Sequence, residues 1–530
     1  MRLPTPPDAG EILLYEETGR ARLYTWAIVA FGSLVLGMLL FAHAHAYFWV
    51  YGLIGISMLG YLFMSYIIAV FGDSNEPTVF PPLRSWPSVD IYYTICGEPP
   101  EICENALTHI LRMQRHYGDQ ATVYVLDDSK GPLGFDLMRK FEGMGRLVHL
   151  RRPEPGKDKK AGNLRHAFAK TSGQFIAVFD ADFCPVEDYL DRLVPFLLED
   201  PRIAILQTPQ FFRVEDHDSW VGRGSANIQE LFYRLIQVCR NSYNASVCVG
   251  TCAMYRRQAL VAFGGSALVQ YSEDMRTGFN CLRLGWKIRY LPYVLAAGLC
   301  PEETNGLINQ QYRWALGSLS LCFCRDFWST PLSFMQRFCY LSGMAYYVVT
   351  GVGLYFTYLP VMLILLFAPD LAHWYNIFFT IPSLLYCTLI YSRWSRSRWG
   401  FHTTRAVQVA FYCHLLAVVD YLRGSLVPWE PTGAVTSQRL FARYKRLVVL
   451  RTGICSTILI GLMCHRLSMV GWVNLLPTAV LLLAEVTLNV SVCGDGSGSW
   501  MEPARRAWKR GTSVAFGVRA FATAAIQWRD

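Results

Sequence analysis

An apolar run in the chain ends in two aspartates that lie two residues apart. The run, "QFIAVFDADF" (residues 174 to 183), is typical of a buried strand and leads into Asp180 and Asp182. Because side chains along a strand alternate in direction, both carboxylates would project the same way, and like charges that close repel each other. A basic side chain, a divalent cation or water at an exposed turn could compensate them. The triplet alone leaves these three possibilities open.

Three other short segments carry polar side chains that could do chemistry. They are "YVLDDSK" with Asp127 and Asp128 after a strand, "YSEDMRTG" with Glu273 and Asp274 at a helix start, and "NQQYRWALGS" with Gln310, Arg313 and Trp314 on a helix. Each also has a purely structural explanation: the double Asp could be a turn, acids at a helix start suit the macrodipole, and Trp314 could anchor an interface. Their order within one domain is therefore more informative than any one of them.

The elements that must position these residues alternate between strands and helices. Helical patterns at 102 to 116, 160 to 171 and 186 to 198 separate the first five of six strand candidates, which are 89 to 95, 122 to 128, 146 to 152, 174 to 180, 203 to 208 and 287 to 293. This alternation predicts a parallel sheet with helices on both faces. Such sheets bind ligands at the carboxyl ends of their strands, which is where both aspartate pairs fall.

The chain is too apolar for an ordinary soluble enzyme. Of its 530 residues 52% are hydrophobic, and two long runs without Lys, Arg, Asp or Glu, 25 to 44 and 48 to 72, can each span a bilayer. The net charge of +9 (49 basic minus 40 acidic residues) comes from basic residues beside the apolar runs. That placement is typical of cytoplasmic loops and argues against nucleic-acid binding. The sixteen cysteines form no zinc spacing.

Changes in composition along the chain predict six membrane spans around one soluble domain. The predicted parts are an N-terminal segment with two spans and a linker (1 to 87), the soluble domain (88 to 336), two spans (337 to 391), an interfacial helix and loop (392 to 446), two spans (447 to 493) and a basic tail (494 to 530). An even number of spans puts both termini on one side, and the basic tail makes that side the cytoplasm. Residues 403 to 422 could cross, but flanking charges favour a helix in the interface.

The motifs, in this order and at these spacings, resemble those of the inverting, processive glycosyltransferases of the cellulose synthase family. The resemblance covers about residues 88 to 330 and includes "KKAGNLR" (159 to 165), "QTPQFF" (207 to 212) and "CVGTCAMYRR" (248 to 257). Two positions depart from it. Where bacterial members often carry Pro-Thr-Tyr-Asn-Glu, this chain has "TICGE" (94 to 98), so that Glu98 matches and Cys96 replaces the aromatic residue; Arg213 stands where an Asn often follows two Phe. These departures concern nucleotide stacking and acceptor contacts, not the reaction class.

The resemblance implies a GT-A, Rossmann-like glycosyltransferase domain inserted between transmembrane helices, with a metal-dependent donor site. Asp182, helped by Asp180, would hold Mg²⁺ or Mn²⁺, and the metal would bridge both phosphates of the donor. Diphosphate contacts are implied for Lys160 and Arg313. Further contacts to the nucleotide or donor are implied for Asp127, Asp128, Glu98, Thr94 and Asp180.

The acceptor side is implied in the same way. Asp274, next to Glu273, would be the general base that takes the proton of the acceptor hydroxyl while it attacks the anomeric carbon from the side opposite the diphosphate. One displacement inverts that carbon, so an α-linked donor gives a β-linked product. Contacts to the acceptor are implied for Trp314, Gln310, Gly250 and Gln207.

The implied activity is a β-glycosyltransferase that polymerises a UDP-sugar and secretes the growing β-glycan through its spans, with the plasma membrane as the favoured location. UDP-glucose is favoured, because Ala and Gly follow the Trp of "RWALGS" (313 to 318) as in the glucan-forming branch; cellulose and mixed-linkage glucan both stay open. The alternatives are a hyaluronan- or chitin-type synthase, a non-processive transferase that glycosylates a lipid, and a transporter with a nucleotide-sensing domain. Glu485 is the clear charged residue within the spans, whereas an ion-coupled carrier usually needs more.

Two further segments are predicted to act around this site. The loop "PWEPTGAVTSQ" (428 to 438) resembles the gating loop of the family in its position. The run after the soluble domain is rich in aromatic residues that could line a conduit, because tyrosine offers both a ring face and a hydroxyl to a sugar; packing at the membrane interface is the alternative explanation. These residues are Tyr346, Tyr347, Tyr355, Phe356 and Tyr358.

Overall fold

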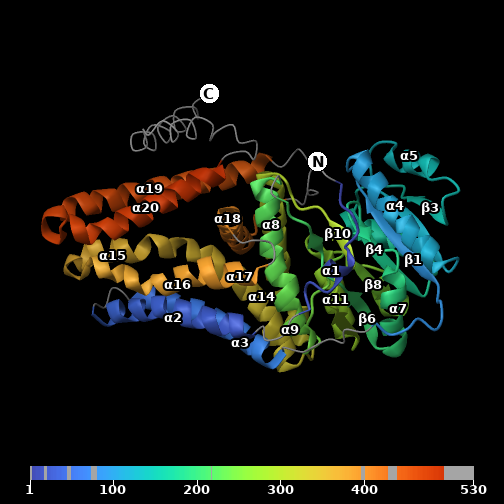
Figure 1. Cartoon of the computed structure of the whole chain (residues 1–530), viewed down its shortest axis with the longest axis horizontal. Helices are drawn as coiled ribbons and strands as arrows, with labels where there is room; N and C mark the ends of the chain where they lie inside the picture. The colour runs from blue at the N-terminus through green and yellow to red at the C-terminus, as the bar shows by residue number, and fades with distance from the viewer. Residues whose placement is uncertain are drawn as a thin grey trace.

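The computed structural model describes residues 3–16, 21–44, 49–72, 80–215, 218–395, 400–427 and 438–493. Within this part, a mixed α/β domain lies at one end of an elongated molecule and a set of apolar helices lies at the other (Figure 1). The predicted gating-like loop, except its last residue, and the predicted tail at 494 to 530 lie outside the described residues.

A seven-stranded sheet forms the centre of the α/β domain. Its strand order is β3-β2-β1-β4-β8-β6-β9. All six predicted strands form, with slightly different ends, and β8 joins them as the seventh strand of this sheet. The strands are β1 (Val89–Ile95), β2 (Ala121–Asp127), β3 (Leu147–Arg151), β4 (Phe175–Asp180), β6 (Ile203–Gln207), β8 (Ala253–Arg256) and β9 (Lys287–Tyr290).

The prediction of a wholly parallel sheet is wrong at one strand. β8 is inserted between β4 and β6 and runs antiparallel to both, while β1, β2, β3 and β4 pair in parallel. β8 comes from "CVGTCAMYRR", which follows a helical segment at 220–241, so a helix before a strand did not make that strand parallel here. The domain is therefore a mixed α/β sheet, and β8 begins just after Gly250 at the same sheet edge as the aspartate pairs.

Alternating strand residues fill two cores, one on each face of the sheet. Ile91, Tyr93 and Phe179 pack with helix α4 (Pro100–Tyr117) and α7 (Tyr189–Glu199), whereas Tyr92 and Val178 pack with residues of α6 (Lys159–Lys170) and α11 (Glu273–Arg283). This is the arrangement that period-two strands covered on both faces require. Helices α5 (Leu133–Lys140) and α10 (Arg257–Leu260) complete this part.

A second, small sheet and the N-terminal segment close the domain. The sheet has the order β5 (Cys184–Pro185), β10 (Ala296–Gly298), β7 (Phe211–Phe212). The segment around α1 (Ala9–Ile12) packs on it: Ile12 joins the domain core, and Arg213 donates to Glu11 at 2.9 and 2.6 Å. The residue that departs from the family pattern, Arg213, thus binds the N-terminal segment of the same chain.

Five described helices are long and apolar enough to cross a membrane, which indicates a membrane protein. They are α2 (Ala21–Ala44), α3 (Trp49–Gly72), α18 (Phe401–Arg423), α19 (Gln438–Val470) and α20 (Trp472–Cys493). The predicted spans between 337 and 391 are instead divided into shorter pieces, which are α14 (Phe334–Gly353), α15 (Leu359–Phe367), α16 (Ile381–Leu385) and intervening turns of 3₁₀ and π helix.

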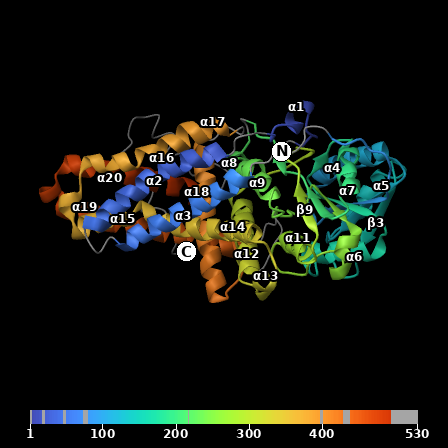
Figure 2. The ribbon, with the colours of Figure 1, turned by 90° about the horizontal axis from the view of Figure 1, so that it is seen from below.

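Helix α18 runs across the direction that α2, α19 and α20 share, as both ribbon views show (Figures 1 and 2). It packs against α12 (Thr304–Cys322), α14 and α8 (Trp220–Leu231). A helix that crosses the long apolar helices in this way cannot share their path through a bilayer. This orientation favours the interfacial position predicted for 403 to 422, which stays a prediction. The predicted domain boundaries also stay predictions.

Candidate active site

The register of the sheet brings the predicted acids to one edge. Thr94 at the end of β1 pairs with Asp180 at the end of β4, and on its other side Ile95 pairs with Asp127 at the end of β2. These three strands are parallel and adjacent, so their carboxyl ends meet. The edge is where the structure places the predicted donor and metal residues.

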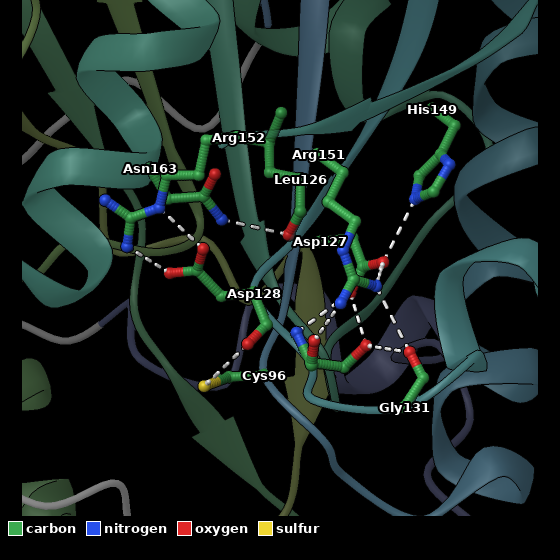
Figure 3. A network of polar contacts seen from close by, with 10 residues as sticks. Cys96, Leu126, Asp127, Asp128, Gly131, His149, Arg151, Arg152 and Asn163 are labelled. Atoms are coloured by element: carbon green, nitrogen blue, oxygen red, sulfur yellow. Dashed lines mark hydrogen bonds and ion pairs between the residues drawn. The ribbon is translucent and has the colours of Figure 1, made fainter. Parts of the chain in front are cut away.

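Asp127 lies at this edge with both carboxylate oxygens occupied (Figure 3). Oδ1 accepts hydrogen bonds from the backbone N–H and hydroxyl of Ser129, and Oδ2 accepts from His149 Nε2 at 3.1 Å and Arg151 Nη1 at 2.9 Å. The side chain has no exposed surface. In this structure Asp127 holds the turn after β2 against the end of β3.

Asp128 forms a two-pronged ion pair with Arg152 beside it. Arg152 Nε donates to Oδ1 at 2.6 Å and Nη2 to Oδ2 at 2.5 Å, and both side chains are buried (Figure 3). Sequence reasoning missed these two arginines, although "RLVHLRR" ends the neighbouring strand and β3 pairs with β2 so that Arg151 lies opposite Asp127. The adjacent Arg-Arg at a strand end was the available signal.

Asp180 meets a basic side chain. Lys160, on the first turn of α6, bonds to Asp180 Oδ1 and also donates to the carbonyl of Gly250 at 2.9 Å. Thr94 Oγ1 donates to the same carboxylate at 3.0 Å. Burial opposes the charge of Lys160, but the carboxylates of Asp180 and Glu273 outweigh it and raise its pKa. Lys160 therefore joins the donor edge to the segment that carries Gly250.

Asp182 has no cationic partner among the described residues. Its Oδ2 accepts one hydrogen bond, from the backbone N–H of Leu299 at 2.7 Å. Burial, together with the charges of Asp180 and Glu98, raises the pKa of Asp182 to about 7. Burial also raises the pKa of Glu98, which accepts from the N–H of Cys96 at 2.7 Å. Among the described residues, Asp180 thus has a basic side chain beside it and Asp182 has no basic side chain.

The donor set at this edge fits a divalent ion that substrate phosphates help to bind. The described residues contain no group of three or more His, Cys, Asp and Glu that could hold a metal by themselves. Mg²⁺ sites of phosphate-transferring proteins, however, commonly use one or two carboxylates plus the phosphates. Asp182, a carboxylate with a raised pKa and no cation beside it, supplies such a ligand, and Asp180 stands two residues away.

Asp274 lies in the first turn of α11 and faces Gly250. Its Oδ1 accepts from the N–H of Met275 at 2.7 Å. Burial and the neighbouring charge of Glu273 raise the pKa of Asp274 to about 7. Gly250 has φ +78° and a Cβ at that position would lie 3.0 Å from Asp274 Cβ, so a side chain there would be strained for two reasons. The structure thus brings together two residues predicted on the acceptor side.

Gln207 is a predicted acceptor residue that the structure buries. Its amide Nε2 donates to the carbonyls of Thr208 and Thr251 at 2.8 Å, and its Oε1 accepts from Val249 N at 3.0 Å. The side chain has no exposed surface. In this structure Gln207 supports the segment that positions Gly250, while its contact with an acceptor stays a prediction.

Helix α12 brings Arg313 and Trp314 to the acids. A Cβ on Gly317 would overlap the hydroxyl of Ser272, so this glycine lets α12 pack closely against the start of α11. Burial lowers the pKa of Arg313, while the charges of Glu273, Asp274 and Asp180 oppose that shift, as expected for a cation close to all three. The neighbouring Gln310 has a buried Oε1 with no hydrogen-bond partner in the described part of the chain.

A cavity of about 200 Å³ leads from these residues toward the apolar helices. Asp274 and Trp314 line it together with tyrosines of α2, α3 and α14, which are Tyr24, Tyr61, Tyr340, Tyr346 and Tyr347. Tyr355 and Tyr358, also predicted for a conduit, do not line it. Tyr358 packs in a separate apolar cluster, and Tyr355 is 44% exposed.

Comparisons with known proteins identify similar glycosyltransferases. Residues 175–392 match the family model described as glycosyl transferase family group 2. The chain is 29% identical to cellulose synthase 2 of Novacetimonas hansenii over 65% of this chain and 22% of that protein. It is 31% identical to the UDP-forming cellulose synthase catalytic subunit of Pseudomonas fluorescens over 65% of this chain and 48% of that protein. The chain thus spans less than half of the length of these relatives.

A solved structure supports the fold. The mannosyltransferase PcManGT of Pyrobaculum calidifontis, in complex with GDP-Man and Mn²⁺, is 16% identical, with a TM-score of 0.51, and the match covers 76% of this chain and 100% of that one. The resemblance to the cellulose synthase family and the GT-A type of domain, both predicted from the motifs, are confirmed.

Proposed function

We propose that this protein is a membrane-embedded inverting glycosyltransferase that polymerises a UDP-sugar, with UDP-glucose favoured, into a β-glucan. The observation that carries the proposal is the position of Asp274: it stands at a sheet edge with carboxylates, Lys160 and Arg313 on one side and a tyrosine-lined cavity on the other. A base between a site for a diphosphate and a site for a sugar chain is what glycosyl transfer to a polymer requires. The UDP-forming relatives support the nucleotide.

The donor would be bound by the acids and cations of the sheet edge. Asp182 and Asp180 would hold a divalent metal, Mg²⁺ or Mn²⁺, which when bound neutralises charge on the diphosphate; the Mn²⁺ in the mannosyltransferase complex supports a divalent ion. Arg313 and Lys160 would contact the leaving diphosphate as fixed cations. Thr94, Glu98, Asp127 and Asp128 are proposed for the nucleotide side, the last two through the turn that their ion pairs hold.

The acceptor would be activated at Asp274. Its carboxylate takes the proton of the terminal hydroxyl, the hydroxyl oxygen bonds to the anomeric carbon, and the bond from that carbon to the diphosphate breaks. The electron pair leaves with UDP and the anomeric centre is inverted. Burial and the charge of Glu273 raise the pKa of Asp274 to about 7, which matches the base to neutral pH. Trp314 offers an apolar ring face to the terminal sugar.

The cavity also supports secretion by the same chain. Tyr61 and Ser65 of α3 line it together with Tyr346 and Tyr347 of α14, so that a polymer leaving Asp274 meets ring faces and hydroxyls among the apolar helices. We propose that the donor site and both termini face the cytoplasm, that the glycan leaves through these helices, and that the membrane is the plasma membrane. The six predicted spans and the domain boundaries form part of this proposal.

A panel of UDP-sugars offered to the purified chain in lipid nanodiscs tests the reaction. We expect polymer from UDP-glucose, and linkage-specific β-glucanases would then distinguish cellulose from mixed-linkage glucan. Polymer from UDP-N-acetylglucosamine would instead indicate a chitin-type or hyaluronan-type synthase. Transfer of a single sugar to lipid would indicate a non-processive enzyme, and UDP-sugar binding without turnover would favour a transporter.

Sealed vesicles test secretion. The chain is reconstituted with its donor site outward and UDP-glucose is supplied outside. We expect polymer that added glycosidase cannot digest until the vesicles are opened. Polymer that is fully digested from outside would mean that the apolar helices only anchor the enzyme.

A further inference from the structure

A single arginine lies in the described wall of the cavity, and it is not one of the predicted site residues. Arg240, on the short helix α9 (Gln237–Asn241), is 6% exposed and lines the cavity together with Asp274. These two are the charged residues of the described lining. Arg240 is the more distant from the sheet edge in the fold, because α9 packs against α3 of the apolar helices.

The guanidinium of Arg240 is only partly satisfied within the described residues. Nη2 donates to Ser342 Oγ at 3.2 Å, and Nε is buried without a hydrogen-bond partner. No carboxylate of the described residues lies within ion-pair distance of it. Other buried arginines differ: Arg234 is paired with Glu230 at 2.8 Å, and Arg451 with Glu485 at 3.1 Å. A buried cation without an anion costs stability, which selection would tolerate where the charge serves a ligand.

The neighbouring residues leave room for that guanidinium. A Cβ on Gly343 would lie 3.1 Å from Arg240 Nη2, so the small residue on α14 lets the side chain lie against the helix. Ser342, the acceptor of the Nη2 hydrogen bond, also lines the cavity, as do Tyr61 and Tyr347. The wall around Arg240 therefore offers hydroxyls and ring faces together with five N–H donors, one of which bonds to another described residue.

We infer that Arg240 is a glycan-binding residue, which holds a sugar unit behind the acceptor terminus by donating hydrogen bonds to hydroxyl oxygens of a neutral β-glycan. The inference rests on the proposed function and deepens it. A sugar ring presents apolar faces and a polar rim, so tyrosines can stack on the faces while a guanidinium reaches two neighbouring oxygens of the rim. Because the terminal sugar is bound between Asp274 and Trp314, Arg240 acts on a later unit.

The test varies acceptor length. The purified full chain transfers glucose from UDP-glucose to β-1,4-glucose oligomers of two to six units, and wild type is compared with Arg240→Met and Arg240→Lys. We expect kcat/KM of the wild type to rise at the length that reaches Arg240. For the longer oligomers, kcat/KM of the Met variant should fall about tenfold or more, which is the usual effect of losing a hydrogen bond to a charged group. In the Met variant, kcat/KM for the shortest acceptor and the KM of UDP-glucose should each change less than twofold. The Lys variant should regain part of the kcat/KM that the Met variant loses.

Arg283→Met is the matched control, because Arg283 is an exposed arginine on α11 that pairs with Asp326 outside the cavity. It should behave as wild type at every length. If kcat/KM of Arg240→Met falls equally at all acceptor lengths, Arg240 supports the fold and the inference is wrong. No fall in kcat/KM at any length would also overturn the inference. A greater preference of the wild type for an oligomer that carries carboxylates would contradict a neutral glycan.

Binding separates this inference from the proposed function. If the wild type transfers no sugar from any UDP donor, the proposed function fails, and calorimetric binding of the six-unit oligomer decides the role of Arg240. Binding that is at least tenfold weaker in Arg240→Met than in Arg283→Met would sustain it. Equal binding in the two variants, or none in the wild type, would contradict it. Thermal melting of each variant confirms that the folded chain is being compared.

Discussion

Aspartates gather at two places on the same edge of the sheet, and their surroundings differ. After β2, Asp127 and Asp128 are buried and each has an arginine, Arg151 or Arg152, within 2.9 Å. Asp182 after β4 and Asp274 in the first turn of α11 instead accept backbone hydrogen bonds, and for each of them burial raises the pKa to about 7.

We expect this difference to separate acids that hold the structure from acids that take part in the proposed reaction. A carboxylate paired with a buried arginine keeps its charge and its place, and it has little left to offer a ligand. A carboxylate whose pKa is raised by enclosure is poised to take up a proton or a cation. The largest effects on transfer should therefore follow changes at Asp274 and Asp182, and the effects after β2 should be mainly on stability.

The largest expected effect is at Asp274. Asp274→Asn removes the group that takes the acceptor proton, and polymer formation should fall by about 10² to 10⁴, the usual range for loss of a general base. Binding of UDP measured by calorimetry should stay within a few-fold of wild type. Weakened UDP binding together with preserved turnover would show that Asp274 belongs to the donor side.

The next effect is at Asp182. Asp182→Asn removes the ligand that has no cation of its own, so Mn²⁺ binding in the presence of UDP, followed by electron paramagnetic resonance, should weaken by about a hundredfold. EDTA should abolish polymer formation by the wild type, and Mn²⁺ or Mg²⁺ should restore it. Asp136→Asn serves as the control with the same chemical change at an exposed aspartate of α5 that pairs with Arg139. Equal Mn²⁺ affinity in the two variants would remove the proposed metal role of Asp182.

The pH dependence of transfer should report the raised pKa of Asp274. The base must be ionised, so kcat/KM at saturating metal should fall about tenfold per pH unit below about 7 and level off above it.

The folding stability of the chain should change with pH in the opposite direction to the rate of transfer. Because the pKa is higher in the folded chain than in the unfolded one, the folded chain binds the proton more tightly, and the stability that this gives is lost as pH rises through about 7. Asp274→Asn should therefore melt at a higher temperature than wild type at pH 8, with a smaller difference at pH 4. A lower melting temperature of the variant at pH 8 would contradict the raised pKa.

The smallest effect on transfer is expected after β2. Arg152→Met leaves the buried carboxylate of Asp128 without its ion pair and should lower the free energy of unfolding by about 3 to 5 kcal/mol, with kcat little changed. The double variant Asp128→Leu with Arg152→Met should recover part of that loss, because no unpaired charge remains. Thermal melting of the full chain in detergent gives the stabilities. A large rise in the KM for UDP-glucose without loss of stability would instead favour direct nucleotide contact by Asp128.

The sequence by itself determined the local elements and showed the family resemblance on which the proposed reaction rests. Strands of alternating or continuous apolar residues, such as 89 to 95 and 174 to 180, end at aspartates, and parallel strands bring their ends together. Side-chain period and strand ends are local properties, so the edge that carries Asp127 and Asp180 could be predicted. The order of the motifs was sufficient to indicate a glycosyltransferase of the cellulose synthase type.

The tertiary structure decided which positive charge each carboxylate meets. Arg151 and Arg152 reach Asp127 and Asp128 from β3, more than twenty residues further along the chain. The antiparallel insertion of β8 brings Gly250 against Asp274, and the packing of α9 against α3 and α14 places Arg240 in the cavity wall. These contacts join segments that are distant in sequence. Composition and spacing do not encode such contacts, because they depend on how whole helices and strands pack.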